Sequence, residues 1–387
     1  MPERRETWLA CHGPLSCNSG QHVRALAVEL AGRGHAVAVC VPERSAADGE
    51  LPTVVPVRTF AEVVRQPGFA PPRLVHLWTP RERMRAFLAT VTARFGAPPP
   101  HVVHLEDSET HLLAGQMGLG PHEIAEIRDG LRPLVVPDHL MHPFHGDRLL
   151  ATAAGVTALA ERLVADLPHD VPAAVFLPGF DPMFAGPRPA AARTVRARLG
   201  IPAGTAIVTY TGNVHAANVA EVRSLLVAVA LVNRRGLPLT LIRTGLDHVP
   251  LAEHGLDVLR GHVIDLGLVP RVDLPDLVHA ADVLVQPGRV DEWNACRLPS
   301  KLPDFLISGR PVILPAVNLG TRLEHGHEAI VLPEATAERI AAALLEWLPQ
   351  RERLAAIGAA GAAFARRALT WSAAADAVET LYDRLPS

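Results

Sequence analysis

The chain has 387 residues, of which 49% are hydrophobic and 20% are charged, and this balance predicts a globular protein with a large buried core. The net charge is only −3 and no basic stripe is interleaved with aromatic residues, which argues against a nucleic-acid-binding protein. No apolar run reaches the roughly 18 residues that a membrane-spanning helix needs, so we expect any membrane contact to be peripheral.

The cysteines and the first residues of the chain bear on its compartment. The four cysteines do not have the paired spacing of metal sites: Cys11, Cys17, Cys40 and Cys296. The opening "MPERRETWLAC" has no apolar signal core. Both features predict a cytoplasmic protein whose thiols stay reduced.

Short apolar runs alternate with segments of helical periodicity through the first half of the chain. Helices are predicted most clearly at residues 20–33 and 81–95. Near-continuous apolar strands between helices indicate a parallel sheet that is covered on both faces. The predicted strands are residues 7–12, 35–41, 54–60, 73–78, 101–107, 133–138 and 173–178.

A Pro/Ala-rich stretch, "GPRPAAARTV" at residues 186–195, predicts a linker, after which the same alternation begins again. From about residue 335 the chain is mainly helical. The sequence therefore predicts an α/β protein with two Rossmann-like parallel-sheet domains that face a cleft, where ligands bind beyond the carboxyl ends of the strands. The second set of predicted strands is residues 206–212, 238–245, 263–269, 282–288, 311–315 and 328–333.

Lys301 is the only lysine among the 37 basic residues of the chain. It lies in "CRLPSKLPDFLISGRPVIL", where Ser300 is a good N-cap for a helix over residues 301–308. The free amides at the start of a helix, with Arg297 and Lys301 beside them, predict a phosphate site. A compact ammonium fits some positions where the planar guanidinium of arginine does not.

Asp304 follows Lys301 by three residues, so the two side chains are expected to face the same side of this helix. A carboxylate can accept hydrogen bonds from two sugar hydroxyls. A cation and a carboxylate together suit a nucleotide, with the diphosphate on Lys301 and the ribose on Asp304. The alternative is structural: Asp304 stabilises the helix dipole and pairs with Lys301.

Two turns at the same predicted sheet edge could complete this site. Gly212 and Asn213 follow the first strand of the second domain, where bare backbone could approach a phosphate. Arg243 ends the next strand, and its alternative role is a salt bridge at the surface.

Polar residues also gather at strand ends in the first domain. Glu106 and Asp107 are candidates for a general base or for binding acceptor hydroxyls, although acids at the start of a helix can equally be a solvated end that meets the dipole. Gly20 and His139 are further candidates for substrate binding and catalysis. His139, His142 and His145 have a spacing that suggests zinc, but Pro143 interrupts a regular helix there and no catalytic glutamate accompanies them, so no metal site is predicted.

Several segments, in this order, resemble GT-B fold glycosyltransferases of the retaining, GT4-like group. The second half resembles the donor domain of that family, and the likeness covers nearly the whole chain. The segments are "SGQHVRALAVELAGRGHAVAV" (19–39), "VTALAERLVADLP…VFLPGFDPMF" (156–184), "GHVIDLGLVPRVDLPDLVHAADVLVQPG" (261–288), "RLPSKLPDFLISGRPVIL" (297–314) and "LTWSAAADAVETLY" (369–382).

The resemblance implies an acceptor-side domain over residues 1–185, a nucleotide-sugar donor domain over residues 186–370, and a helix over residues 371–387 that returns to the first domain. It implies sugar transfer from a nucleotide-diphosphate sugar to a hydroxyl acceptor, with retention, with no cofactor and no metal. A UDP-sugar is weakly favoured as the donor. No Asp-x-Asp tripeptide occurs in the chain.

The chain departs from the family pattern at two places. The family has two glutamates separated by seven residues, of which the later, ribose-binding one matches Asp304 and the earlier one falls at Cys296. Glu292 and Asn294 are candidates for part of the missing work on the donor sugar. The family's phosphate-binding Arg/Lys pair after the first strand of the donor domain is also missing, which leaves the diphosphate to Arg297 and Lys301.

Two other functions fit the same fold. A nucleotide-sugar epimerase would release a changed sugar nucleotide without an acceptor. A non-catalytic partner would bind a sugar nucleotide without turnover, as the departure at Cys296 allows. The sequence names neither the base, the sugar nor the acceptor.

Overall fold

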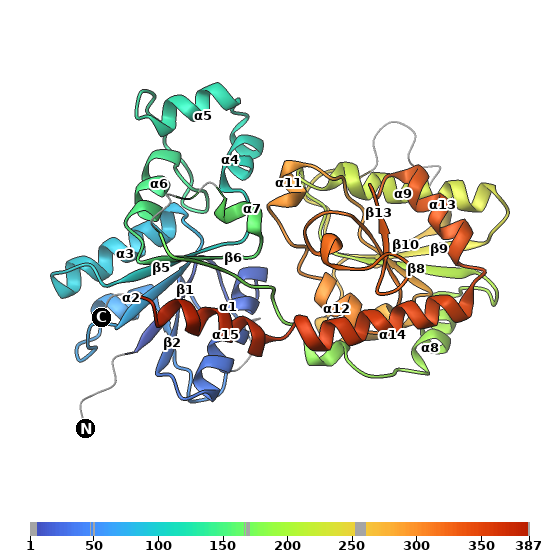
Figure 1. The fold of residues 1–387 in the computed structure, drawn as a ribbon, viewed down its shortest axis with the longest axis horizontal. Helices are drawn as coiled ribbons and strands as arrows, with labels where there is room; N and C mark the ends of the chain where they lie inside the picture. Colours follow the sequence, from blue (N-terminus) through green and yellow to red (C-terminus); the bar gives the residue numbers. More distant parts are fainter. Residues whose placement is uncertain are drawn as a thin grey trace. The chain divides into compact units, whose positions relative to one another are not determined.

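The computed structural model describes residues 6–46, 48, 51–165, 167, 171–251 and 261–385. The chain divides into two compact units (Figure 1). Unit 1 comprises Met1–Pro178 and Trp371–Ser387, and unit 2 comprises Gly179–Thr370.

Unit 1 is built on a parallel sheet with the order β3-β2-β1-β4-β5-β6-β7 in the described residues. Its strands are β1 Thr7–Cys11, β2 Val37–Val41, β3 Val57–Thr59, β4 Leu74–Trp78, β5 His101–Leu105, β6 Gly155–Ala158 and β7 Ala173–Val175. Strands β1, β2, β4 and β5 are buried along their whole length, because helices cover both faces of the sheet. The helices are α1 Asn18–Gly32, α2 Phe60–Arg65, α3 Glu82–Phe95, α4 Glu109–Met117, α5 Pro121–Arg128, α6 Pro143–Ala151, α7 Glu161–Val164 and α15 Trp371–Tyr382.

Unit 2 repeats the design, with a parallel sheet of order β10-β9-β8-β11-β12-β13 in the described residues. The predicted class of two parallel-sheet α/β domains is therefore confirmed. The strands are β8 Ala206–Thr211, β9 Leu239–Thr244, β10 Val263–Asp265, β11 Val283–Val285, β12 Val312–Pro315 and β13 Ile330–Leu332. The helices are α8 Ala191–Leu199, α9 Val219–Arg234, α10 Leu274–Ala280, α11 Glu292–Ala295, α12 Leu302–Ile307, α13 Ala337–Trp347 and α14 Arg351–Ala368.

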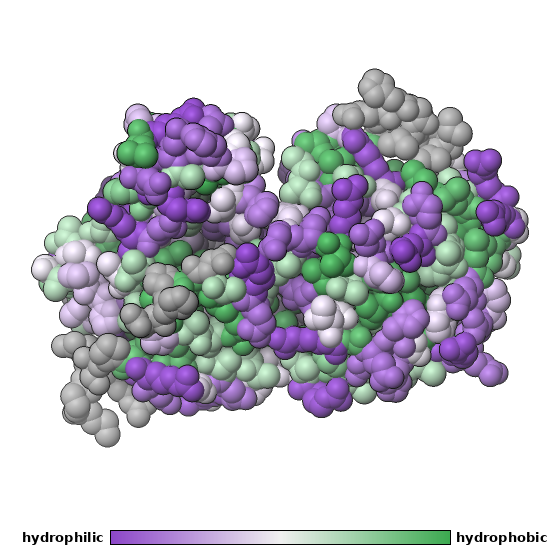
Figure 2. Space-filling model, turned by 45° about the horizontal axis from the view of Figure 1, so that its top comes forward, coloured by the Kyte–Doolittle hydropathy of each residue, from purple (hydrophilic) through white to green (hydrophobic). Residues whose placement is uncertain are grey.

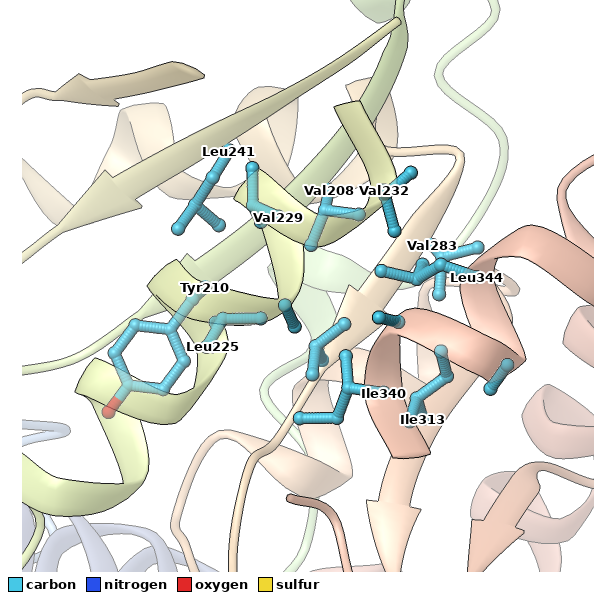
Figure 3. Close-up of a cluster of buried hydrophobic side chains, with 14 of the residues drawn as sticks. Val208, Tyr210, Leu225, Val229, Val232, Leu241, Val283, Ile313, Ile340 and Leu344 are labelled. Atoms are coloured by element: carbon cyan, nitrogen blue, oxygen red, sulfur yellow. The ribbon is translucent and has the colours of Figure 1, made fainter. Parts of the chain in front are cut away.

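One core cluster of unit 2 lies between the sheet and helices α9 and α13 (Figure 3). Aliphatic side chains of the two helices, such as Leu225 and Ile340, meet strand residues such as Val208 there. Burying each such side chain contributes about 1.5–3 kcal/mol. Tyr210 lies at the end of the cluster, and its hydroxyl points away from the aliphatic side chains (Figure 3). This position puts a rigid aromatic face at the carboxyl end of β8.

Helix α15 is held in unit 1 by a buried chain of hydrogen bonds. The Tyr382 hydroxyl lies 2.7 Å from His76 Nδ1, and His76 Nε2 lies 2.9 Å from Thr157 Oγ1. Burial pushes the pKa of His76 well below its ordinary value, so the ring is neutral at pH 7. At the surface, Arg33 of α1 donates to Asp376 and Glu379 of α15.

Tyr382→Phe is expected to lower the free energy of unfolding by about 1–3 kcal/mol, because it leaves His76 Nδ1 buried without its partner. Chemical denaturation at pH 7.5 measures the change. The control is Thr380→Val, which removes an exposed hydroxyl of the same helix and should change the unfolding free energy by less than about 0.5 kcal/mol. Equal values for Tyr382→Phe and wild type would show that the buried bond adds nothing to stability.

The structure corrects several predicted elements. Residues 133–138 form a loop, not a strand: two prolines interrupt them and Val135 is 91% exposed. Strand β6 was not predicted, because Gly155 and Thr157 break its apolar run. Residues 186–195 are not a linker, since α8 begins at Ala191, and the chain changes units at Pro178 instead. Helix α12 begins at Leu302, so Lys301, not Ser300, is at its N-cap position.

The described part of the chain contains no helix that is both long and apolar enough to cross a bilayer. The surface in Figure 2 shows hydrophilic and hydrophobic residues intermixed over the face in view.

Candidate functional site

The Lys301 ammonium is enclosed by the Tyr210 ring and the Gly212 turn at the carboxyl end of β8, and this enclosed position is named the Lys301 recess. Its Nζ is 3.9 Å from the centroid of the Tyr210 ring. A Cβ atom placed on Gly212 would lie 2.9 Å from the same Nζ, and Gly212 has a φ of +137°, which side-chain-bearing residues rarely adopt. The position suits a compact cation over an aromatic face.

The recess depends on the close approach of two turns. Gly212 has a φ of +137° and Gly245 a φ of +110°. A Cβ on Gly245 would lie 2.4 Å from the carbonyl oxygen of Gly212, so the two backbones meet without side chains between them. The Gly212 N–H donates to the Thr244 carbonyl oxygen at 3.1 Å, which extends the pairing of β8 with β9. The predicted approach of bare backbone at Gly212 is thus present.

The pKa of Lys301 is lowered to about 7. Burial is the largest cause, the positive charge of Arg297 acts in the same direction, and Glu221 opposes both effects. The ligand-free protein therefore loses the ammonium charge at a lower pH than an ordinary lysine would. An anion beside Nζ would favour the charged form.

Arg297 is the second cation of the site, and it is held by a ring of hydrogen bonds. Its Nη2 donates to Glu221 Oε2 at 2.9 Å and its Nε donates to Asn294 Oδ1 at 3.0 Å. Asn294 Nδ2 in turn donates to Glu221 Oε1 at 2.8 Å. Burial raises the pKa of Glu221, while Arg297 and the Asn294 hydrogen bond lower it. The guanidinium is therefore fixed in one orientation.

The loop after Gly212 carries a histidine that favours its neutral form. His215 lies exposed at this loop, and burial of part of its ring, together with the positive charges of Arg297 and Lys301, lowers its pKa. The loop is fixed by Asn218, whose Oδ1 accepts from the His215 N–H at 2.9 Å. The Asn213 side chain accepts from the Leu246 N–H at 2.9 Å, so it braces the loop. The loop after Gly212 is therefore held in place by its own asparagine side chains.

The comparisons with known proteins agree with this geometry. Residues 205–350, which contain the recess and the ring, match the model of the family described as glycosyl transferases group 1. D-inositol 3-phosphate glycosyltransferase of Thermobispora bispora is 28% identical over 309 residues, which are 70% of this chain and 68% of that protein.

Solved structures of similar fold span the whole chain. HepE from Anabaena, in complex with UDP and glucose, superposes with a TM-score of 0.71 at 15% identity, covering 98% of this chain and 100% of HepE. Sucrose-phosphate synthase from Thermosynechococcus elongatus gives 0.69 at 16% identity, with 98% and 99% covered. The lipopolysaccharide glycosyltransferase WaaG gives 0.66 at 16% identity, with 97% and 99% covered.

The chain is a GT-B glycosyltransferase. The predicted resemblance to GT-B glycosyltransferases is confirmed, whereas retention and the GT4-like group stay predictions.

In this glycosyltransferase, Asp304 has partners other than Lys301. Its Oδ1 accepts from the Asp181 N–H at 2.8 Å, and its Oδ2 lies 3.7 Å from Arg271 Nη2. Lys301 contacts the end of β8, so the two side chains meet different parts of unit 2. The six-residue helix α12 also has only a small dipole, so the side-chain cations carry most of the positive charge. The predicted role of Asp304 in ribose binding stays a prediction.

Arg243 is engaged in ion pairs within unit 2 of the glycosyltransferase. Its side chain is 2% exposed, and its guanidinium donates to Asp247 at 2.6 and 3.1 Å and to Asp265 from Nε at 3.1 Å. The arginine is buried while its two carboxylate partners are partly exposed, and the ion pairs join strand β9 to β10 and to the loop after β9. These partners argue against a substrate contact of Arg243, whose predicted role stays a prediction.

Cys296 stands where the family has its first glutamate. Its side chain is 8% exposed, and a thiol supplies no carboxylate to a ligand. Asn294 is also buried and belongs to the ring that holds Arg297, whereas Glu292 lies exposed in the first turn of α11. The residue that the sequence did not reveal is Glu221. Its only signal was an acid in the first turn of the helix after the glycine loop.

In unit 1, Glu106 is a buried anchor. Its carboxylate accepts from Trp78 Nε1 at 2.8 Å, lies 2.9 Å from His22 Nδ1, and hydrogen-bonds Ser19 Oγ. Burial raises the pKa of Glu106, but the hydrogen bonds from His22 and Ser19 outweigh it and hold the pKa well below its ordinary value. Such a carboxylate is a weak base, so the contacts argue against the predicted role of Glu106 as a general base.

Among the other candidates of unit 1, Asp107 follows Glu106 in the chain and Gly20 follows its partner Ser19, whereas His139 contacts helix α4. His139 is exposed, and its Nε2 lies 3.0 Å from Gln116 Oε1. Asp107 adjoins the buried Arg81–Glu109 ion pair and acts on it electrostatically. Gly20 is required by packing, since a Cβ there would lie 2.3 Å from the Pro14 carbonyl oxygen. None of these contacts brings His139 to the other candidates.

The histidines at 142 and 145 stack, with ring centroids 4.5 Å apart. Over the described residues, no group of three or more His, Cys, Asp or Glu side chains has the arrangement of a metal site.

Proposed function

We propose that this glycosyltransferase moves a sugar from a nucleoside-diphosphate sugar to a hydroxyl group of an acceptor, with retention of configuration, as a member of the GT4-like group. The observation that carries the proposal is the Lys301 recess, where an ammonium lies beside bare backbone at a parallel-strand end. This is the kind of position where ligands bind in α/β sheets. The UDP and glucose bound by HepE support UDP-glucose as the first donor to test.

In the proposed reaction, negative charge develops on the diphosphate as its bond to the sugar breaks. Lys301 and Arg297 stabilise that charge from fixed positions. Gly212, which has no side chain, lets the diphosphate approach the protein backbone at the turn after β8. The protein's own cations would then neutralise the leaving group without a resident metal ion. The proposed acceptor is a polyol or sugar, as the name of the Thermobispora bispora relative suggests.

The test is a thermal-shift panel with UDP, GDP, ADP and their glucose and mannose esters, because a ligand that binds only the folded state raises the unfolding temperature. We expect a concentration-dependent shift with one nucleotide, which Lys301→Ala reduces. Turnover of the selected donor is then measured with inositol phosphates and hexose phosphates as acceptors. Release of a changed sugar nucleotide without an acceptor would instead indicate an epimerase, and binding without any turnover a non-catalytic partner. A panel without any shift would contradict the proposal.

A further inference from the structure

Glu221, Asn294 and Arg297 form a closed ring of hydrogen bonds that joins helix α9 to helix α11 and to the segment after it. Each oxygen of the Glu221 carboxylate accepts from a different partner, Oε2 from Arg297 at 2.9 Å and Oε1 from Asn294 at 2.8 Å. The ring closes through Arg297 Nε and Asn294 Oδ1 at 3.0 Å. The Glu221 and Arg297 side chains are only 9% and 12% exposed, so water screens their attraction weakly.

The ring uses only part of the hydrogen-bonding capacity of Arg297. A guanidinium has five N–H donors, and the ring takes one from Nε and one from Nη2. The plane is held further by Trp293, whose ring centroid lies 5.3 Å from the central carbon of the guanidinium, and by Asn318, which donates to the Arg297 carbonyl oxygen at 2.7 Å. An arginine fixed in this way loses little conformational entropy when an oxyanion binds to its other donors.

We infer that Glu221 is a positioning residue, which orients Arg297 toward the diphosphate of the donor. The inference rests on the proposed function. It assigns the site a carboxylate from helix α9, Glu221, whereas the position of the family's first acid is held by the buried Cys296. Glu221 acts through Arg297 and does not itself contact the reacting atoms.

Positioning and simple electrostatics predict opposite results for the loss of the Glu221 charge. A carboxylate beside Arg297 and Lys301 reduces the positive charge that a diphosphate meets, so its removal alone would tighten binding. If Glu221 orients Arg297, its removal lets the guanidinium move and weakens binding. The sign of the change therefore separates the two roles.

The experiment is calorimetric titration with UDP of wild type, Glu221→Gln, Arg297→Ala and the double variant. An amide at 221 can still accept from Arg297 on one side, but its NH₂ group would face the NH₂ group of Asn294. We expect Glu221→Gln to weaken UDP binding roughly tenfold, the order expected for a lost hydrogen bond to a charged group. In the Arg297→Ala background the same substitution should have no weakening effect, because the group that it orients is gone.

Two further variants keep the test decisive. Asn294→Ala opens the ring at another member and should weaken UDP binding by a similar factor, which also covers the case that Glu221→Gln does not fold. Asp276→Asn removes a carboxylate from the Arg188 ion pair of the same unit, at 2.8 Å, and should leave the affinity unchanged.

Three outcomes would overturn the inference: tighter UDP binding by Glu221→Gln, an equal loss in both backgrounds, or a lower unfolding temperature with unchanged affinity. Failure of wild type to bind UDP would contradict the proposed uridine-nucleotide donor, so the two failures are distinguishable.

Discussion

Lys301→Ala is expected to lower kcat/KM for the sugar nucleotide by about 2–4 kcal/mol of transition-state stabilisation, the loss typical when one preorganised charge-stabilising group is removed. The ammonium lies 3.9 Å from the Tyr210 centroid and close to the bare backbone of Gly212, so no neighbouring side chain can take its place there. Initial rates at several donor concentrations measure the effect.

Lys301→Arg should recover only part of this loss. The guanidinium keeps the charge, but it is planar and presents its donors in a fixed fork, so they would not coincide with the position of the Lys301 Nζ. Arg188→Ala, a cation of the same unit that pairs with Asp276, is the matched control and should retain full activity. Wild-type activity in Lys301→Ala would reject the assigned role.

The second large effect concerns pH. The dissociation constant for UDP is expected to rise about tenfold per pH unit above pH 7, because Lys301 is then neutral in the free protein and must take up a proton to meet the diphosphate. Below pH 7 the ammonium is already present and this dependence disappears. Burial is the main cause of the lowered pKa, and it is a property of the ligand-free recess. Titration calorimetry in buffers of different ionisation enthalpy measures the proton uptake directly.

The stability of the free protein should change in the opposite direction. Between pH 7 and 10.5 an unfolded chain protonates Lys301 while the folded chain leaves it neutral, so stability rises with pH through this window. Lys301→Met removes the group and should abolish both pH dependences. At pH 7 this variant should unfold at a higher temperature than wild type. Unchanged pH profiles in Lys301→Met would show that another group titrates.

The strands could be predicted because buried parallel strands have an unmistakable composition. Runs such as "HAVAVCV" and "AIVTYTG" are apolar on both faces, and they became β2 and β8. The loop at residues 133–138 has the same apolar residues, but its prolines prevent strand pairing. Composition alone therefore overestimated one strand and missed β6, whose pairing depends on its neighbours in space.

Site residues could be predicted only where their place at the end of a strand or the start of a helix puts them at the ligand-binding edge of the sheet. Lys301 and Gly212 were found because a strand end and a helix start meet at the same sheet edge. The roles of Arg243, Glu106 and Glu221 depend on partners 22, 84 and 76 residues away, and no local pattern reveals which partner a charged side chain meets. The long-range partners argue that Arg243 and Glu106 serve the fold, and they place Glu221, which was not predicted, in the candidate site.

The scarcity of lysine also makes the molecule chemically simple. Lys301 carries the only side-chain primary amine in 387 residues, and its pKa, lowered to about 7 chiefly by burial, makes it a better nucleophile near neutral pH than an ordinary lysine. An amine-directed acylating reagent at pH 7 can therefore form a stable side-chain adduct only at Lys301. The α-amino group at the chain terminus is the other amine that it can modify. A single mass increment would then report whether the recess is open, and ligands that fill it would compete with the reagent.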